Sequence, residues 1–234
     1  MVATGFSVLV AGCGEDDSFR PLPDAAVVEV DAAVDAPPLP DAAAPVTVFT
    51  SDLETTIPPE IAAGTGLLAA SSGFAPLGPT GNQFGPTFLR SATGNTVTLT
   101  VTLPAHTAIS IGFLFAAIDS LDGTGTFPAG DYLRIDLDGA SIFRESLANA
   151  TDAQIQSYVP SAGAELARRI DLGFGGPGGF YTDSAYDMSV EPRFQGIPHT
   201  ASTAVIAFTL EGEGVQTLDD ESWAVDNLRV TAIP

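Results

Sequence analysis

The side chains of this sequence that could do chemistry are above all carboxylates, and one group of them lies near the C-terminal end. There the chain reads DDESWAVDNLRV, with Asp219, Asp220 and Glu221 directly ahead of Trp223, the only tryptophan. Carboxylate oxygens are the ligands that calcium prefers, and one ion takes about 6–8 oxygens. Acidic residues are also common in solvated turns. The stretch therefore indicates either a turn or the edge of a cation site.

A second acidic group surrounds the stretch SLDGTGTFPAGD. It consists of Asp119, Asp122 and Asp131, and the first two are three residues apart. Gly123 and Gly125 permit the chain to wrap tightly, so these acids could form an oxygen cage around a calcium ion. The pattern lacks the closing Glu and the regular ligand spacing of an EF-hand loop. Solvated turn residues are the alternative here too.

Patterns typical of enzymes are scarce, and we assign no catalytic residue. His106 and His199 do not have the spacing of zinc ligands, and no nucleophile-elbow pattern occurs. The glycine-rich stretch FGGPGGFY, residues 174–181, lacks the lysine of a phosphate-binding loop. A glycoside hydrolase that uses two carboxylates is left as an alternative. We expect a protein that binds rather than catalyses.

The charge of the chain excludes some partners. The formal net charge is −21, and all 8 basic residues are arginines. Nucleic acids and anionic membrane surfaces are bound by clustered Lys and Arg, so neither is an expected partner. A strongly acidic surface instead favours solubility and the binding of hard cations.

The N-terminal residues look like an export signal. Phe6 to Ala11 is an apolar run too short to span a bilayer, which needs about 20 residues, and it is followed by Gly12 and Cys13, the only cysteine. The tetrapeptide Val10-Ala11-Gly12-Cys13 resembles the lipobox of bacterial lipoproteins. The resemblance implies that residues 1–12 are a signal peptide and that lipid is attached to the thiol of Cys13. A core strand with a buried cysteine is the alternative.

Residues 13–45 are rich in Asp, Ala, Val and Pro. Repeated prolines oppose helix and sheet, and like charges repel, so we expect an acidic, low-complexity, disordered tether. Such a tract directly after a lipobox resembles the spacer of surface lipoproteins in Gram-negative bacteria. The resemblance implies a lipid anchor in the cell envelope, at the outer membrane, with the folded part periplasmic or surface-exposed.

Residues 46–234 have the period-two alternation of β-strands. Thr96 to Leu103 reads TVTLTVTL, with apolar side chains on one face, and Ala108 to Ile118 is apolar throughout, as in a central strand covered on both faces. Asp138-Gly139 predicts a tight hairpin turn between two strands. Further strands are predicted at 132–137, 140–144, 186–190, 204–210 and 223–232. Two short helices are predicted at 151–154, from a capping box, and at 165–169. Many short strands with long loops favour a two-sheet β-sandwich.

Three stretches of the sequence indicate which kind of β-sandwich this is. They are FTSDLETTI (49–57), the segment 103–139, and DESWAVDNLRV (220–230). Together they resemble jelly-roll domains of secreted bacterial proteins, in the group that includes lectin-like domains and carbohydrate-binding modules. The resemblance implies a jelly-roll fold with a structural calcium that joins the first and last strands through Glu54 and Asp226. It also implies a carbohydrate or a cell-surface protein as the partner; a structural or protein-contact lipoprotein without glycan binding is the alternative.

Two further expectations concern side chains in this domain. Strict alternation puts Trp223, Val225 and Asn227 on one face of the last strand, and Asp226 with Leu228 on the other. A covered Asp226 would need a partner, and a cation is the simplest one. Aromatic side chains that could stack on a sugar ring, or anchor a loop instead, are Tyr132, Phe180 and Tyr181.

Overall fold

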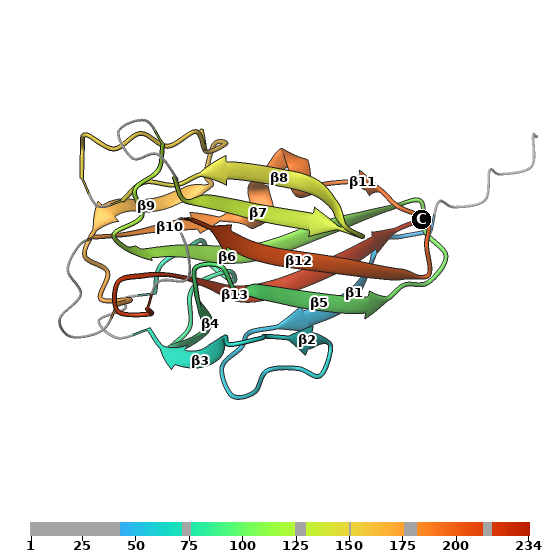
Figure 1. The fold of residues 1–234 in the computed structure, drawn as a ribbon. Coiled ribbons are helices and arrows are strands. Elements are labelled where there is room, and N and C mark those ends of the chain that lie inside the picture. The colour runs from blue at the N-terminus through green and yellow to red at the C-terminus, as the bar shows by residue number, and fades with distance from the viewer. Residues whose placement is uncertain (1–42, 72–75, 125–129, 150, 176–181, 213–216) are drawn as a thin grey trace, which may run out of the picture. The chain divides into compact units, whose positions relative to one another are not determined.

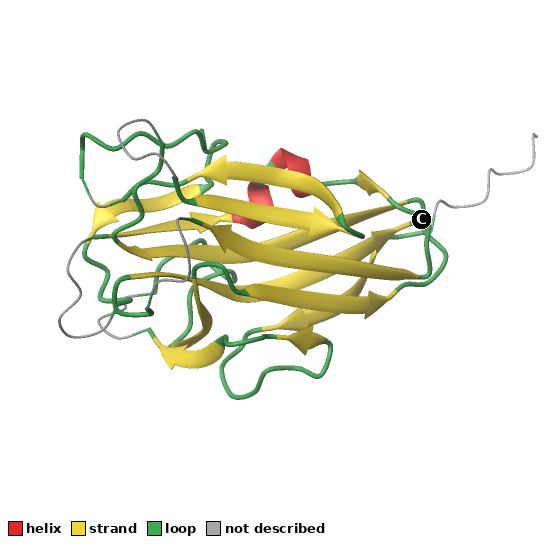
Figure 2. Cartoon of the chain, in the orientation of Figure 1, coloured by secondary structure: helices red, strands yellow, loops and turns green. Residues whose placement is uncertain are grey.

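The computed structural model describes residues 43–71, 76–124, 130–149, 151–175, 182–212 and 217–234. Within these residues two antiparallel β-sheets pack face to face (Figure 1), and helical structure is confined to two short 3-10 turns (Figure 2). The predicted two-sheet β-sandwich is confirmed. Among the residues described, no helix is long and apolar enough to cross a membrane.

The larger sheet contains β1 (Val46–Ser51), β3 (Leu67–Ala70), β4 (Thr87–Ala92), β6 (Ala108–Asp119), β9 (Glu165–Ile170), β10 (Asp183–Asp187), β11 (Ile197–Pro198) and β13 (Glu221–Ile233). The smaller sheet contains β2 (Ile61–Ala62), β5 (Thr96–Thr102), β7 (Tyr132–Leu137), β8 (Ala140–Ser146) and β12 (Thr203–Glu211). The 3-10 turns are η1 (Met188–Val190) and η2 (Pro192–Phe194).

The strand order is that of a jelly roll. The neighbours run β4-β13-β6-β10 in the larger sheet and β5-β12-β7-β8 in the smaller one. The chain therefore passes from one sheet to the other at eight of the twelve connections between the described strands, and the last two strands insert between strands formed much earlier. This arrangement is two interlocked Greek keys, which define the jelly roll.

The alternating pattern of β5 explains its place in the smaller sheet. Val97, Leu99 and Val101 are at most 3% exposed and face the other sheet, whereas the threonines between them lie outside or half-buried. The strand pairs with β12 along its whole length. At about 1.5–3 kcal/mol per fully buried aliphatic side chain, these three residues fix the face that the strand buries.

The central strand β6 is buried on both faces, as its uniform apolarity predicts. Phe113 and Phe115 belong to the core between the sheets, while Leu114 and Ala116 belong to a second apolar cluster. The members of the second cluster are Phe84, Phe88, Leu114, Ala116, Ile118, Phe174, Ala185 and Ala224. Loop residues such as Phe84 and Phe174 thus cover part of the outer face of the larger sheet.

A β-bulge in the closing strand β13 overturns the predicted alternation after Asp226. The register against β6 shifts between Asp226 and Arg229, and Asn227 has a φ of 49°. Trp223 and Val225 share one face as predicted, and that face is the core, but the shift turns Leu228 into the same core instead of placing it beside Asp226. A bulge adds one residue to one strand of a pair, so every side chain beyond it changes face.

The two predicted helices are wrong. Residues 165–169 form β9, because pairing with β10 outweighs a weak local helix preference. At 151–154 the Gln154 side chain does accept a hydrogen bond from the Thr151 backbone N–H at 2.8 Å, as in a capping box, but the chain only turns there. The strand predicted at 186–190 ends at Asp187 and continues as η1.

Candidate metal centre

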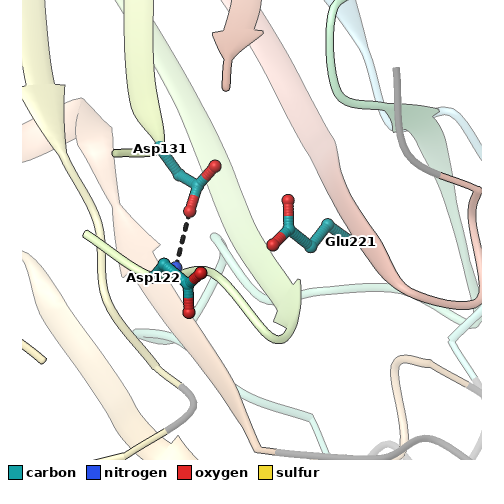
Figure 3. Close-up of side chains that lie close together, drawn as sticks. All are labelled: Asp122, Asp131 and Glu221. Carbon is teal, nitrogen blue, oxygen red and sulfur yellow. Dashed lines mark hydrogen bonds between the residues drawn. The ribbon is translucent and has the colours of Figure 1, made fainter. Parts of the chain in front are cut away.

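Three carboxylates from three strand ends meet at one end of the sandwich (Figure 3). Asp122 follows β6, Asp131 immediately precedes β7, and Glu221 is the first residue of β13. One carboxylate oxygen from each of these residues lies within 4.8 Å of the others. Asp131 and Glu221 are 4% and 5% exposed, and Asp122 is half-buried. The sequence predicted the pairing of Asp122 with Asp131 but not Glu221 as the third member.

The backbone around this group is arranged by glycines. Gly123 and Gly130 have φ values of 69° and 64°, in the left-handed region that glycine tolerates best. A Cβ at Gly123 would overlap the carbonyl oxygen of Ile155, and one at Gly130 would overlap the carbonyl oxygen of Gly123. The predicted tight wrap is therefore present at Gly123, and Gly125 lies outside the described residues.

Hydrogen bonds orient two of the carboxylates. The backbone N–H of Asp122 donates to Asp131 Oδ2 at 2.5 Å, and Gln154 Nε2 donates to Asp122 Oδ1. Asp122 also forms a β-bridge with Ala148. The next residue, Asn149, is fully buried, and its Oδ1 has no hydrogen-bond partner among the described residues.

Carboxylates this close together would favour a bound cation when they are ionised. Two ionised carboxylates whose oxygens lie within 4.8 Å of each other would repel by at least about 3 kcal/mol at an effective dielectric constant of about 20. Calcium binds oxygens at about 2.3–2.6 Å, so two ligands of one ion can be as much as about 5 Å apart. The spacing and the oxygen chemistry of Asp122, Asp131 and Glu221 therefore fit a calcium ion, with carbonyl oxygens or water completing the shell.

Asp119 does not join this group of three. It ends β6 with a φ of 69°, is 2% exposed and stands opposite Glu221 in the β6–β13 register. Its backbone carbonyl accepts a hydrogen bond from Asn149 Nδ2 at 2.6 Å. Asp119 thus lies beside the candidate metal centre, where its backbone carbonyl is bonded to Asn149.

The second predicted site, Glu54 with Asp226, lies around Gly85. Asp226 is fully buried; its Oδ2 accepts from the Gly85 N–H at 2.9 Å and its Oδ1 from the Asn227 N–H at 2.7 Å. Burial raises the pKa of Asp226 to about 7, and the negative charges of Glu54 and Asp52 add to the rise. The two amides act in the opposite direction, because they stabilise the ionised form.

Glu54 lies in the loop after β1 rather than on the opening strand, because β1 ends at Ser51. Burial raises the pKa of this half-buried carboxyl, as does the neighbouring Asp52. A Cβ at position 85 would overlap Glu54 Oε1, so only glycine lets this carboxylate approach the backbone that also bonds Asp226. Glu54 and Asp226 supply two carboxylates, and therefore a less complete oxygen shell than the three of Asp122, Asp131 and Glu221.

Among the predicted sugar-stacking residues, the structure describes Tyr132. It is half-buried, and the guanidinium of Arg144 lies 4.0 Å from the centre of its ring. The cation therefore occupies one face of the ring that a sugar would use. Phe180 and Tyr181, like Cys13 and most of the predicted tether, lie outside the described residues.

A buried pair of histidines lies at the other end of the sandwich, and sequence reasoning missed it. His106 Nε2 and His199 Nδ1 are 2.7 Å apart, and the rings are nearly parallel, at 17°. The outer nitrogens bond the carbonyl of Pro104 at 2.6 Å and the carboxylate of Asp138 at 2.9 Å. Because all four ring nitrogens form hydrogen bonds within the protein, we interpret the pair as a structural contact that holds loops together.

Comparisons with known proteins identify no family for this chain. No family model and no curated protein matches the chain. The K3 cleaved adhesin domain of Lys-gingipain from Porphyromonas gingivalis is 14% identical, with a TM-score of 0.37 over 80% of this chain and 100% of that domain. The CBM51 of Clostridium perfringens, solved with methyl-galactose, is 11% identical, with a TM-score of 0.35 over 77% of this chain and 99% of that module.

A cycloisomaltooligosaccharide glucanotransferase from Paenibacillus is 12% identical, with a TM-score of 0.35 over 77% of this chain, but the chain spans only 18% of that enzyme. At these identities and TM-scores the likenesses carry no functional argument. The jelly-roll assignment rests on the strand order.

Proposed function

We propose that this chain is a lipid-anchored binding protein of the cell envelope, whose jelly-roll domain is stabilised by calcium and binds a cell-surface glycan. The observation that carries the proposal is the meeting of Asp122, Asp131 and Glu221 within 4.8 Å at the loop end of the sandwich. Calcium there would join the ends of β6, β7 and β13, which are far apart in the sequence. A bound ion would supply positive charge and a link between loops through the oxygens of the three carboxylates.

The surface chemistry supports a polar ligand. The outer face of β5 presents Thr96, Thr98, Thr100 and Thr102, and Thr96 shares a hydrogen bond of 2.8 Å with Thr209 of β12. Hydroxyl-bearing faces can exchange hydrogen bonds with sugar hydroxyls, whereas the net charge of −21 disfavours nucleic acids and anionic membranes. Attachment by lipid on Cys13, with export to the outer membrane of a Gram-negative bacterium, belongs to the same proposal.

The proposal is tested by glycan-array binding in calcium and in chelator, with wild type and Asp131→Asn. We expect saturable binding to a restricted set of glycans, weaker in chelator and in Asp131→Asn. Asp152→Asn is the matched control, because the Asp152 side chain is fully exposed and its ion pair with Arg169, at 2.9 Å, is of the solvent-exposed kind that contributes little to stability. Absence of glycan binding in calcium, by a protein that unfolds cooperatively, would contradict the proposed ligand class.

A protein-contact role is the second candidate, and one observation favours it. β9 ends the larger sheet with no further neighbour among the described strands. Ile155, Val159 and Ile170, which precede or end this strand, are 62%, 82% and 53% exposed. An open strand edge with exposed apolar side chains is typical of a protein contact. In that case Val159→Asp would abolish cell-surface binding and leave any glycan binding unchanged.

A further inference from the structure

A polar groove lies on the outer face of the larger sheet, away from the candidate metal centre. It has a volume of about 90 Å³, and its lining includes Ser110, Gly112, Ser189, Gln195, Arg229 and Thr231. The floor comes from β6, one wall from β13, and the other wall from η1 and the residue after η2. A hollow of this size takes one functional group or one edge of a sugar ring rather than a whole oligosaccharide, since sites for drug-sized ligands are about 300–1,000 Å³.

The β-bulge at Asn227 is what brings Arg229 to this groove. Without the bulge, alternation would send Arg229 into the core together with Trp223 and Val225. With it, Arg229 lies outside, directly opposite Gly112 of β6. Bulges in strands are known to re-aim a side chain in this way.

Gly112 keeps the floor of the groove open. A Cβ at this position would lie 3.1 Å from Ser189 Cβ and 3.8 Å from Arg229 Nη2. Any other residue would therefore press against Ser189 and fill the space next to the Arg229 guanidinium. Glycine in a strand interior weakens the strand and often marks a place that a ligand approaches.

Arg229 is exposed, and its side chain has no hydrogen bond or ion pair among the described residues. Arg134, Arg144 and Arg193 in the same domain all pair with carboxylates, at 2.6–3.3 Å. Among the described residues Arg90 and Arg168 also lack an ion pair with a carboxylate, but Arg90 is buried and Arg168 is half-buried, whereas Arg229 presents its guanidinium at the surface. Its planar fork matches a carboxylate in a bidentate way, which an ammonium group cannot do.

The surrounding groups suit a sugar that carries such a carboxylate. Ser110 and Thr231 supply hydroxyls that can donate to sugar hydroxyls, and the oxygen of Ser189 can accept from them. The nearby buried Asp187 accepts both the N–H and the hydroxyl of Ser189, at 2.9 and 2.5 Å, so its Oδ1 is already engaged. We propose that this groove binds the carboxylate of an acidic sugar, with Arg229 as the residue that selects it. The inference rests on the proposed glycan binding and names the class of sugar.

The test is a titration of the ¹⁵N-labelled protein followed by amide shifts in NMR, with methyl glucuronoside and its neutral counterpart methyl glucoside as probes. We expect the acidic sugar to shift the amides of Gly112, Arg229 and Thr231, and to bind about tenfold more tightly than the glucoside, as one charge-assisted pair implies. Arg229→Gln should remove this preference without lowering the melting temperature, because the side chain contacts nothing that it holds in place. Arg229→Lys should retain part of it.

Arg134→Gln is the control for loss of an arginine elsewhere on the surface. Equal binding of both sugars in the groove, or an unchanged preference in Arg229→Gln, overturns the acidic-sugar inference and leaves glycan binding standing. Absence of shifts in the groove with either probe also overturns it. The glycan array tests the proposed function separately, so failure of that function would appear there.

Discussion

Asp226 offers the sharpest test of the electrostatics, through the variant Asp226→Asn. Its pKa is raised to about 7 in the folded protein, chiefly by burial, against about 3.9 in an unfolded chain. Between about pH 4 and pH 7 the folded metal-free protein therefore holds a proton that the unfolded chain has released. Its stability falls as the pH rises through this window, and levels off above it.

The magnitude follows from the size of the shift. A difference of about three pKa units corresponds to about 4 kcal/mol, which the ionised Asp226 costs the folded protein above pH 7. Asparagine removes this cost, but its amide group can accept from only one of the two backbone N–H donors, those of Gly85 and Asn227. The other donor is left unpaired, at a cost of about 1–3 kcal/mol. We expect a net stabilisation of about 1–3 kcal/mol at pH 7.5 in chelator.

The assay is thermal unfolding in chelator from pH 4.5 to pH 8, with wild type, Asp226→Asn and the exposed control Asp152→Asn. Asp226→Asn should melt about 2–4 °C higher per kcal/mol at pH 7.5, and at or below the wild-type temperature at pH 4.5. The reasoning is refuted if Asp226→Asn is destabilised equally at both pH values. That result would mean that the two amides stabilise the carboxylate more than burial opposes it.

Three further predictions concern other parts of the chain. Asp131→Asn should lose the gain in melting temperature that calcium gives the wild type, which for a site filled at a hundredfold excess over Kd is about 2.7 kcal/mol; an undiminished gain would place the ion elsewhere. Asn227→Val should destabilise by about 1–3 kcal/mol, because a β-branched residue is strained at a φ of 49°, while Asn227→Gly should cost less in the same urea titration. Cys13→Ala should move the protein from the detergent phase to the aqueous phase of a detergent-partition assay; equal partitioning of both proteins would count against a lipid anchor.

The sequence predicted the fold where local pattern and burial agree. Thr96–Thr102 alternates and is buried on one face, and Ala108–Asp119 is uniformly apolar and buried on both. In Thr96–Thr102 the solvent contact of every second residue decides the structure, and in Ala108–Asp119 the burial of both faces does; both patterns can be recognised within the strand itself. The helix predicted at 165–169 failed because the partner that makes it a strand, β10, follows more than ten residues later.

The bulge and the candidate sites depend on non-local contacts. Nothing in the letters DNLRV marks where the register shifts, apart from an asparagine that tolerates a positive φ. Glu221 becomes the third carboxylate of the centre because β13 begins opposite the end of β6, far away in the sequence. His106 and His199 meet across 93 positions. Such pairings follow from the order of strands in the sheets, which spacing along one chain does not encode.

A calcium ion held by Asp122, Asp131 and Glu221 can be detected by isothermal titration of the purified protein with calcium. We expect saturable calcium binding that is lost in Asp131→Asn, retained in Asp152→Asn, and not matched by magnesium, whose near-ideal octahedral geometry suits this set of carboxylates less well. A wild-type protein without calcium binding, or calcium binding unchanged in Asp131→Asn, would contradict this expectation.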